Sequence, residues 1–282
     1  MATKYWDGGG AAGDFGAAAN WSDDAAPANN DVLILSSNSE AITGAAVSGD
    51  NMDLVVGPGW TGNIGTTGTE LEADFDNIDY SGKALAVYID PTQAVTAINI
   101  SDTGPGDTAL VIRGTTTVTN LRCTGGSGTV TFGTSRTITT VEMIGASGLT
   151  LDLASGTVVG TTLRMDAGIC KIDAAFTNVE VFGGTLEITG NPTIATLDIY
   201  GGTVKYNVSG STAAISTRLA VYGGTFDASG VTGSAATITG AEMYDAGTID
   251  ERSGLETITW SGGIAVHGGT LRLDPGRTVT VA

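Results

Sequence analysis

The 282-residue chain is poor in the residue types on which most catalytic and metal-binding proteins depend. It has two cysteines, Cys123 and Cys170, and a single histidine, His267. The cysteines have neither a CxxC nor a zinc-site spacing, so we expect two buried thiols. With one histidine and no GxSxG, HExxH or P-loop sequence, no serine triad, zinc protease or nucleotidase signature can be built. We therefore predict a non-enzymatic protein with no metal and no cofactor.

Basic residues and long apolar runs are also scarce. Twelve Lys and Arg stand against 30 Asp and Glu, which gives a net charge of −18. Such a surface repels nucleic-acid phosphates and anionic lipid head groups, so we expect neither nucleic acid nor membrane as a partner. No apolar run approaches the roughly 18 residues of a membrane span, and the opening MATKYWDGGG lacks the apolar core of a secretory signal. We expect synthesis in a cytoplasm without signal-dependent export.

Helical periodicity and proline are missing as well, whereas glycine is abundant. No segment of about 12 residues places apolar side chains at helical spacing. The chain has 43 glycines, roughly twice the ordinary content, but only 6 prolines. Because proline is scarce, collagen-like and proline-rich disordered chains are excluded. A hydrophobic content of 41% excludes a disordered acidic tail. An all-β protein with glycine at its turns remains.

A phrase of two short alternating strands around a glycine corner recurs along the C-terminal part of the chain. The copies are VEVFGGTLEIT from Val179, LDIYGGTVKYN from Leu197, LAVYGGTFDAS from Leu219 and IAVHGGTLRLD from Ile264, with looser copies LRMDAGICKID from Leu163 and AEMYDAGTIDE from Ala241. Their corner glycines are 16 to 23 residues apart. A strand-only period of about 20 residues is typical of a β-solenoid. The sequence therefore predicts a single-stranded, right-handed parallel β-helix.

The chain divides into three predicted segments. Residues 1–31 place Trp6, Phe15 and Trp21 among Gly, Ala and Asn, and form either a cap over the open end of the solenoid or an arm that anchors a partner. Residues 32–106 form irregular, acidic first coils. Residues 107–282 form the regular solenoid. The charge is concentrated at the start, since residues 1–82 hold 13 acidic residues and one basic residue.

The repeat sorts its side chains between the core and the surface. In the strands on both sides of the corner, alternate aliphatic residues point inward, so Glu187, Lys205, Asp227 and Arg272 point outward with opposite signs one coil apart. The residue before each corner is out of phase with the core. These corner residues are Phe182, Tyr200, Tyr222, Tyr244 and His267, and in-register coils stack them into an external ladder. The ladder either stabilises the solenoid alone or forms an interface, for which a symmetric trimer is the expected assembly.

Two groups of charged residues offer weaker candidates for chemistry. The run ELEADFDNIDY alternates acidic with other residues, which predicts one strand with its acids on one face. Asp74, Asp76 and Asp79 have the chemistry of a Ca²⁺ site or of a glycosidase carboxylate pair, although a solvated strand face is the favoured interpretation. A polysaccharide lyase would need basic groups among acids. The candidates for that role are Arg164 and Lys171 with Asp166 and Asp173.

The opening segment resembles a motif at the start of many β-solenoid proteins in the structural gene regions of tailed bacteriophages. A similar phrase opens coils in autotransporter-like passenger repeats. The resemblance covers about 35 residues and is carried by Trp6, Gly8, Gly9, Phe15, Ala18, Asn20, Trp21, Ser22, Pro27, Asp31, Val32 and Ile34. An autotransporter requires a signal peptide and a C-terminal membrane barrel, which this sequence lacks, so the phage class is favoured.

The resemblance implies a virion structural protein, and we expect a capsid decoration (cement) protein that binds the outer surface of the major capsid protein as a homotrimer. The alternatives are a tail fibre or receptor-binding protein and a polysaccharide-degrading β-helix enzyme. The predicted location is the virion, after synthesis in the host cytoplasm. The predicted interface residues are Trp6, Phe15, Trp21, Phe182, Tyr200, Tyr222, Tyr244 and His267.

Overall fold

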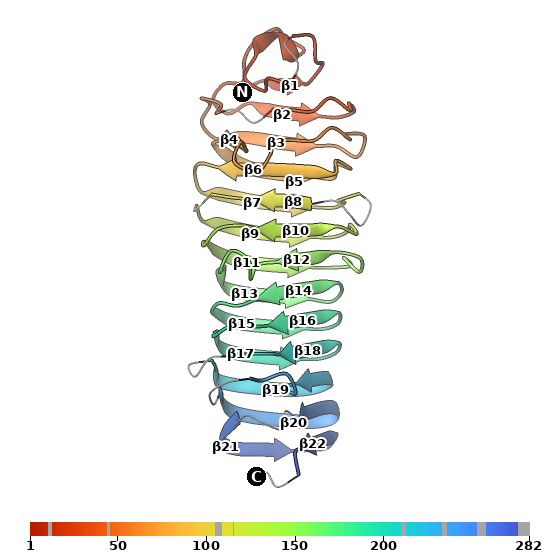
Figure 1. Ribbon diagram of the computed structural model, residues 1–282, viewed down its shortest axis with the longest axis vertical. Coiled ribbons are helices and arrows are strands. Elements are labelled where there is room, and N and C mark those ends of the chain that lie inside the picture. The colour runs from red at the N-terminus through yellow and green to blue at the C-terminus, as the bar shows by residue number, and fades with distance from the viewer. Residues whose placement is uncertain are drawn as a thin grey trace. The chain divides into compact units, whose positions relative to one another are not determined.

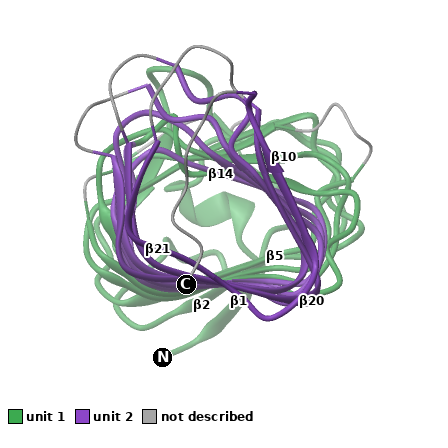
Figure 2. Cartoon of the chain, turned by 90° about the horizontal axis from the view of Figure 1, so that it is seen from below, with its two compact units in different colours: residues 1–139, 144–156 green, residues 140–143, 157–282 purple. Residues whose placement is uncertain are grey.

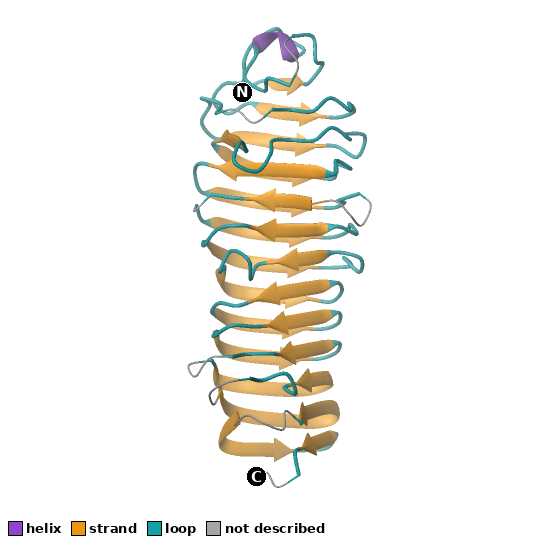
Figure 3. Cartoon of the chain, in the orientation of Figure 1, coloured by secondary structure: helices purple, strands orange, loops and turns teal. Residues whose placement is uncertain are grey.

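The protein is an all-β solenoid, as the repeat predicts. A computed structural model describes residues 1–10, 13–43, 46–104, 109–114, 116–209, 213–232, 236–252 and 258–275. Within these residues the regular structure consists of 22 strands and a single short 3-10 helix, η1 (Ala18–Asn20). Figure 3 colours the strands orange and the helix purple. Strands of successive coils pair in parallel, so each coil continues the hydrogen-bonded ladder of the coil before it (Figure 1). Alternating β-branched and apolar residues favour this arrangement.

The chain forms two compact units, which Figure 2 colours separately. Unit 1 comprises Met1–Thr139 and Ile144–Gly156, and unit 2 comprises Thr140–Met143 and Thr157–Ala282. Strand β11 (Thr137–Met143) contributes to both units. The boundary that the sequence suggested between residues 106 and 107 lies outside the described residues.

Unit 1 contains two parallel stacks of strands. The first stack is β1 (Thr3–Tyr5), β2 (Val32–Leu35), β3 (Met52–Val56), β5 (Phe75–Tyr80), β7 (Val95–Ile100) and β9 (Val118–Cys123). The second is β4 (Leu71–Ala73), β6 (Ala86–Pro91), β8 (Ala109–Ile112), β10 (Thr129–Phe132) and β12 (Thr150–Asp152). From β3 onward, each coil thus supplies one strand to each stack.

Unit 2 repeats the same plan with more uniform corners. One stack runs through β13 (Val159–Met165), β15 (Phe176–Val181), β17 (Thr193–Ile199), β19 (Ala214–Asp227), β20 (Ala236–Glu251) and β21 (Ile258–Val266). The other runs through β14 (Ile169–Ile172), β16 (Thr185–Ile188), β18 (Thr203–Tyr206), the second halves of β19 and β20, and β22 (Thr270–Leu273). In β19 and β20 the strand continues through the corner without a break.

The core of unit 2 has the predicted phase. The aliphatic positions before the corners, such as Val181, Ile199 and Val221, are fully buried, and so are Ile188 and Tyr206 beyond them. Side chains from successive coils therefore stack in the interior, where burial of apolar area provides most of the stabilisation. The exceptions lie in the last described coil, where Leu271 and Leu273 are half-buried and Val266, also predicted to point inward, is 37% exposed. Val266 lies on β21, and no further described coil continues its ladder, so its side chain has a neighbour on one side only.

The acidic run of unit 1 departs from its prediction. ELEADFDNIDY was expected to form one strand, but it forms β4 and β5 with a break at Asp74. Strand β4 pairs with β6, whereas β5 pairs with β3 and β7, so the acids do not share one face. Leu71 of β4 and Phe75 of β5 are both fully buried, so each of the two strands contributes to the core.

Candidate functional site

The aromatic residues before the corners of unit 2 form a continuous ladder. Successive ring centroids in the series Phe182, Tyr200, Tyr222, Tyr244 and His267 are 4.7, 4.9, 4.7 and 4.8 Å apart. The planes of neighbouring rings are inclined by 7 to 23°. This spacing equals the separation of adjacent strands, so the rings follow the register of the backbone. The predicted stacking of these five side chains, which we call the aromatic ladder, is confirmed.

Two glycines follow four of the five rings and allow the coils to stack closely, whereas Asp245 and Ala246 follow Tyr244. A Cβ atom on Gly201 would lie 2.5 Å from the carbonyl oxygen of Phe182, and one on Gly223 would lie 2.5 Å from that of Tyr200. Any side chain at these corners would therefore displace the backbone of the coil below. The second glycine of the corner, such as Gly202, has a φ of 72°, which glycine adopts far more readily than other residues. The ring-Gly-Gly phrase thus encodes an in-register corner.

The ladder presents ring edges rather than ring faces. Because the rings stack on one another, each inner face is covered by its neighbour. Even so, Phe182 is 40% exposed and Tyr200 is 43% exposed, and His267 is also exposed. Tyr222 and Tyr244 are half-buried. The result is a narrow exposed stripe of aromatic edges and phenol hydroxyls on one side of unit 2.

An arginine covers the first ring of the ladder. The guanidinium carbon of Arg164 lies 4.8 Å from the centroid of Phe182, an arrangement that gives a cation–π attraction. Arg164 was a candidate for lyase chemistry together with Lys171. The structure places Lys171 beyond the corner on β14, in register with Glu187 of the next coil. Arg164 therefore belongs to the ladder, and Lys171 belongs to a separate column of charges.

Charged groups of both signs border the ladder. Asp198 accepts a hydrogen bond from Arg218, and Glu242 accepts one of 2.8 Å from the Tyr244 hydroxyl. This hydrogen bond is the main cause of the raised pKa of Tyr244, while partial desolvation, followed by Asp198, raises the pKa of Tyr200. Both phenols therefore stay neutral at physiological pH and can donate hydrogen bonds.

A second column of charges on the far side of the corner confirms the predicted alternation as far as Asp227, which is in register with another acid, Asp250. Glu187 is in register with Lys205, which is in register with Asp227. The Lys205 Nζ atom lies 3.0 Å from Glu187 Oε1, and Arg272 Nη1 lies 3.4 Å from an oxygen of Asp250 one coil away. Exposed pairs of this kind each contribute about 0 to 1 kcal/mol to the free energy of unfolding. They therefore favour one strand register over others more than they stabilise the fold.

The predicted N-terminal interface residues are buried within unit 1. Trp21 and Phe15 are fully buried and Trp6 is 6% exposed. Trp21 lies edge-on to Phe15 and Trp6, with centroids 5.0 and 5.4 Å away, and its Nε1 donates to the Phe15 carbonyl oxygen at 2.9 Å. Trp60, which the sequence did not single out, completes the cluster 6.3 Å from Trp6. The segment thus forms the cap, and these rings offer little surface to a partner.

The remaining candidates are placed as follows. Asp76 accepts a hydrogen bond from Thr96 at 2.5 Å, and Asp79 accepts one from Asn99 at 2.7 Å, so both belong to polar ladders on the outside of unit 1. Among the described residues, no three His, Cys, Asp or Glu side chains gather as a metal site requires. Cys123 and Cys170 are buried as predicted, and burial raises the pKa of Cys123 to about 12. That thiol is therefore unreactive at neutral pH.

Comparisons with family models, curated proteins and solved structures found no match to this chain. Within the described residues, no helix has the length and apolar character needed to cross a membrane.

Proposed function

We propose that this protein is a non-enzymatic virion structural protein of a tailed phage, and that it acts as a capsid decoration protein. The observation that carries the proposal is the exposed aromatic ladder of unit 2. A stripe of five stacked rings that the core does not require is the kind of apolar surface that an assembly covers. The resemblance of residues 1–34 to the opening segments of phage solenoid proteins is the reason for proposing a phage virion as the assembly.

The spacing of the rings favours further copies of the same chain as the occupant of the ladder. A partner that covers the whole stripe must repeat every 4.7 to 4.9 Å, as the rings do. A second copy in parallel orientation has this repeat along its own ladder. Three copies around a three-fold axis bring three ladders together at equal height, which buries all the exposed ring edges. We therefore propose a homotrimer.

The distribution of charge supports a role at a surface rather than with nucleic acid. The acidic residues of the chain are concentrated in residues 1–82, with a single basic residue, Lys4. Lys4 is itself buried and paired with Asp23 at 2.5 Å, so it does not offset the acidic exterior. In the proposed assembly this acidic part faces the major capsid protein, and unit 2 carries the trimer interface.

The copy number in the virion tests this proposal. Quantitative mass spectrometry of purified virions from the phage that encodes this chain should find it in numbers comparable with capsid subunits. Mild denaturant should release all copies together while the capsid shell remains. The major capsid protein is the internal standard. A few copies per particle, or release together with tail proteins, would contradict the decoration role and favour the tail fibre.

A further inference from the structure

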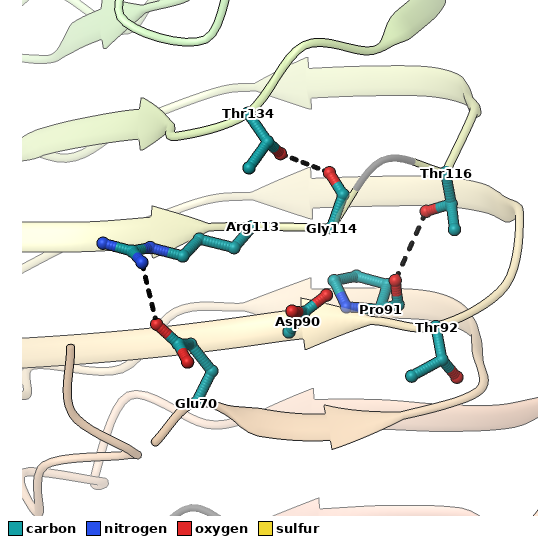
Figure 4. Close-up of a pocket in the computed structure, with 8 residues that line it drawn as sticks. All are labelled: Glu70, Asp90, Pro91, Thr92, Arg113, Gly114, Thr116 and Thr134. Carbon is teal, nitrogen blue, oxygen red and sulfur yellow. Dashed lines mark hydrogen bonds and ion pairs between the residues drawn. The ribbon is translucent and has the colours of Figure 1, made fainter. Parts of the chain in front are cut away.

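Unit 1 contains a polar cavity that the proposed structural role does not use. Its volume is about 450 Å³, within the range of ligand-binding clefts. Figure 4 shows that its walls come from successive coils and from the residue before β4. The side chains that determine its chemistry are Glu70, Asp90, Thr92, Arg113, Thr116 and Thr134.

The register of three strands builds the cavity. Ile89 of β6 is in register with Ile112 of β8, and Ile112 is in register with Phe132 of β10. Strands β8 and β10 end at these residues, whereas β6 continues to Pro91 because Asp90 and Pro91 pair with Glu72 and Ala73 of β4. The coil corners in this place lack the repeated ring-Gly-Gly phrase of unit 2, so their loops diverge and leave a hollow.

A glycine keeps the hollow open. Gly114 has a φ of 89°, and a Cβ atom on it would lie 2.5 Å from Asp90 Oδ1 and 2.6 Å from the carbonyl oxygen of Pro91. The Asp90 carboxyl therefore rests directly against the backbone of the next coil. A side chain at residue 114 would push the carboxyl out of place.

The wall behind Gly114 carries a buried cation. Arg136 is 4% exposed, and its Nη2 donates to the carbonyl oxygens of Ile112 and Gly114 and to the Thr134 hydroxyl, the last at 2.8 Å. Its Nε and Nη1 atoms are buried without a hydrogen-bond partner, and burial lowers the pKa of Arg136 to about 10. A fixed guanidinium thus stabilises the polar wall from inside, and holds the Thr134 hydroxyl at the rim.

The polar groups at the cavity fall into paired and unpaired sets. Arg113 Nη1 lies 3.1 Å from Glu70 Oε1, so these two side chains hold each other in place. The buried Nε of Arg113 has no partner, and Asp90 has no hydrogen-bond or ion-pair partner among the described residues. Burial is the main cause of a raised pKa at Asp90, and Glu72 and Glu70 add to it. An unpaired carboxyl beside a guanidinium is the free recognition group of this cavity.

This set of groups selects the ligand class. Apart from Pro91, the lining is polar, so an apolar ligand would leave its donors and acceptors unpaired. Anions are repelled by Asp90, Glu70 and the acidic surface of residues 1–82. A neutral polyol fits, because its hydroxyls can donate to Asp90 and accept from Arg113 and the threonines at the same time. We propose that this cavity is a binding site for one or two residues of a neutral saccharide.

The first test is a direct binding measurement on the full-length protein. The probes are a panel of neutral mono- and disaccharides, and the same sugars as non-reducing ends of longer oligosaccharides, titrated by calorimetry. Binding of at least one neutral sugar supports the site, and preference for the oligosaccharide ends identifies a glycan rather than a free sugar as the source. No binding of any neutral sugar, or binding of spermidine or glucuronate alone, would overturn the proposal.

Paired variants locate the binding. Asp90→Asn retains the shape of the side chain but removes the charged acceptor, and we expect affinity to fall about 10-fold or more. Asp76→Asn is the matched control, since it changes a carboxyl of unit 1 that faces Thr96 outside the cavity, and it should leave affinity unchanged. Thr92→Val, at an exposed rim position, should weaken binding several-fold. This variant tests the site independently should Asp90→Asn prove unstable. Affinity equal to that of the parent protein in both Asp90→Asn and Thr92→Val would overturn the proposed location.

The pH profile provides an independent readout. Because the ionised carboxyl of Asp90 is the better acceptor and its pKa is raised, affinity should fall as the pH drops through that pKa, at a higher pH than for an ordinary aspartate. The Asp90→Asn variant should lose this acidic limb. An identical profile in both proteins would contradict a contact between the sugar and Asp90.

Discussion

Units 1 and 2 use the same coil but differ in how regular their corners are, and this difference separates their surfaces. Unit 2 repeats one corner phrase, so side chains of one kind align into ladders on its outside. Unit 1 changes its corner from coil to coil, so its described residues form no aromatic ladder, and its loops diverge around a polar cavity. Regular repetition thus produces long flat surfaces suited to assembly, and irregularity produces concave sites suited to small ligands.

The largest expected effect is on the cap of unit 1. Trp21→Ala removes a fully buried ring that contacts Phe15 and Trp6, and it should lower the free energy of unfolding by about 3–5 kcal/mol. Tyr5→Ala, which truncates an aromatic residue that is 49% exposed on β1, is the control and should have a small effect. Chemical denaturation of both variants measures the difference. Equal stability of the two would mean that the cap does not protect the coils of unit 1.

The second prediction concerns assembly through unit 2. The double variant Tyr200→Glu with Tyr222→Glu places charges one coil apart in the aromatic ladder, and should weaken self-association by about 100-fold or more because ionised groups would have to be buried. Light scattering at fixed concentration should show a folded monomer instead of a trimer. Lys205→Glu changes the net charge by the same amount on the other side of the corner, and should remain trimeric. A trimeric double variant would remove the ladder from the interface.

The third prediction tests why the corners of unit 2 are regular. Gly202→Ala places a Cβ atom 2.5 Å from the Gly184 carbonyl oxygen at a φ of 72°, and should cost roughly 1–3 kcal/mol. Gly262→Ala is a matched control in the same unit, because Gly262 also has a positive φ but no atom within 4 Å of the added Cβ. The difference between the two melting temperatures isolates the contact between stacked corners. If both glycines tolerate alanine equally, close backbone stacking is not what requires glycine.

The smallest expected effect is electrostatic. Hydrogen bonds from Arg252, the main cause, and from Arg272 lower the pKa of Asp250. Because its pKa is lower in the folded state, the Asp250 carboxyl stabilises the folded protein at pH values above its unfolded-state pKa. This stabilisation is lost as the pH falls through the folded-state pKa. Asp250→Asn should therefore cost up to about 1 kcal/mol at neutral pH, with a difference from the parent protein that shrinks below about pH 4.

Asp227→Asn is the control for this prediction, because Asp227 occupies the same column one coil away and bonds to Ser229 instead of arginine. Thermal unfolding at several pH values compares the three proteins. A destabilisation of Asp250→Asn that is as large at low pH as at neutral pH would show that its cause is packing and not charge.

Most of the fold of unit 2 could be predicted because its information is local and repeated. The ring-Gly-Gly phrase specifies a corner, the alternation on each side specifies which residues are buried, and the fixed period specifies the register. Parallel in-register strands then place equal positions above one another, so the ladder of Phe182 to His267 follows from counting residues. Unit 1 lacks this redundancy, which is why ELEADFDNIDY was assigned to one strand instead of two.

Sequence alone determined the all-β solenoid, the inward and outward phase of its strands, the stacked aromatic ladder and the acidic surface, because each depends on the order of neighbouring residues. Tertiary structure alone decided that Trp60 completes the cap, that Arg164 covers Phe182, and that Glu70, Asp90 and Arg113 meet at one cavity. The three cavity residues are 20 or more positions apart in unit 1 and have no shared motif. Only the length of each coil brings them together, and that length depends on how irregular loops close, which no short pattern records.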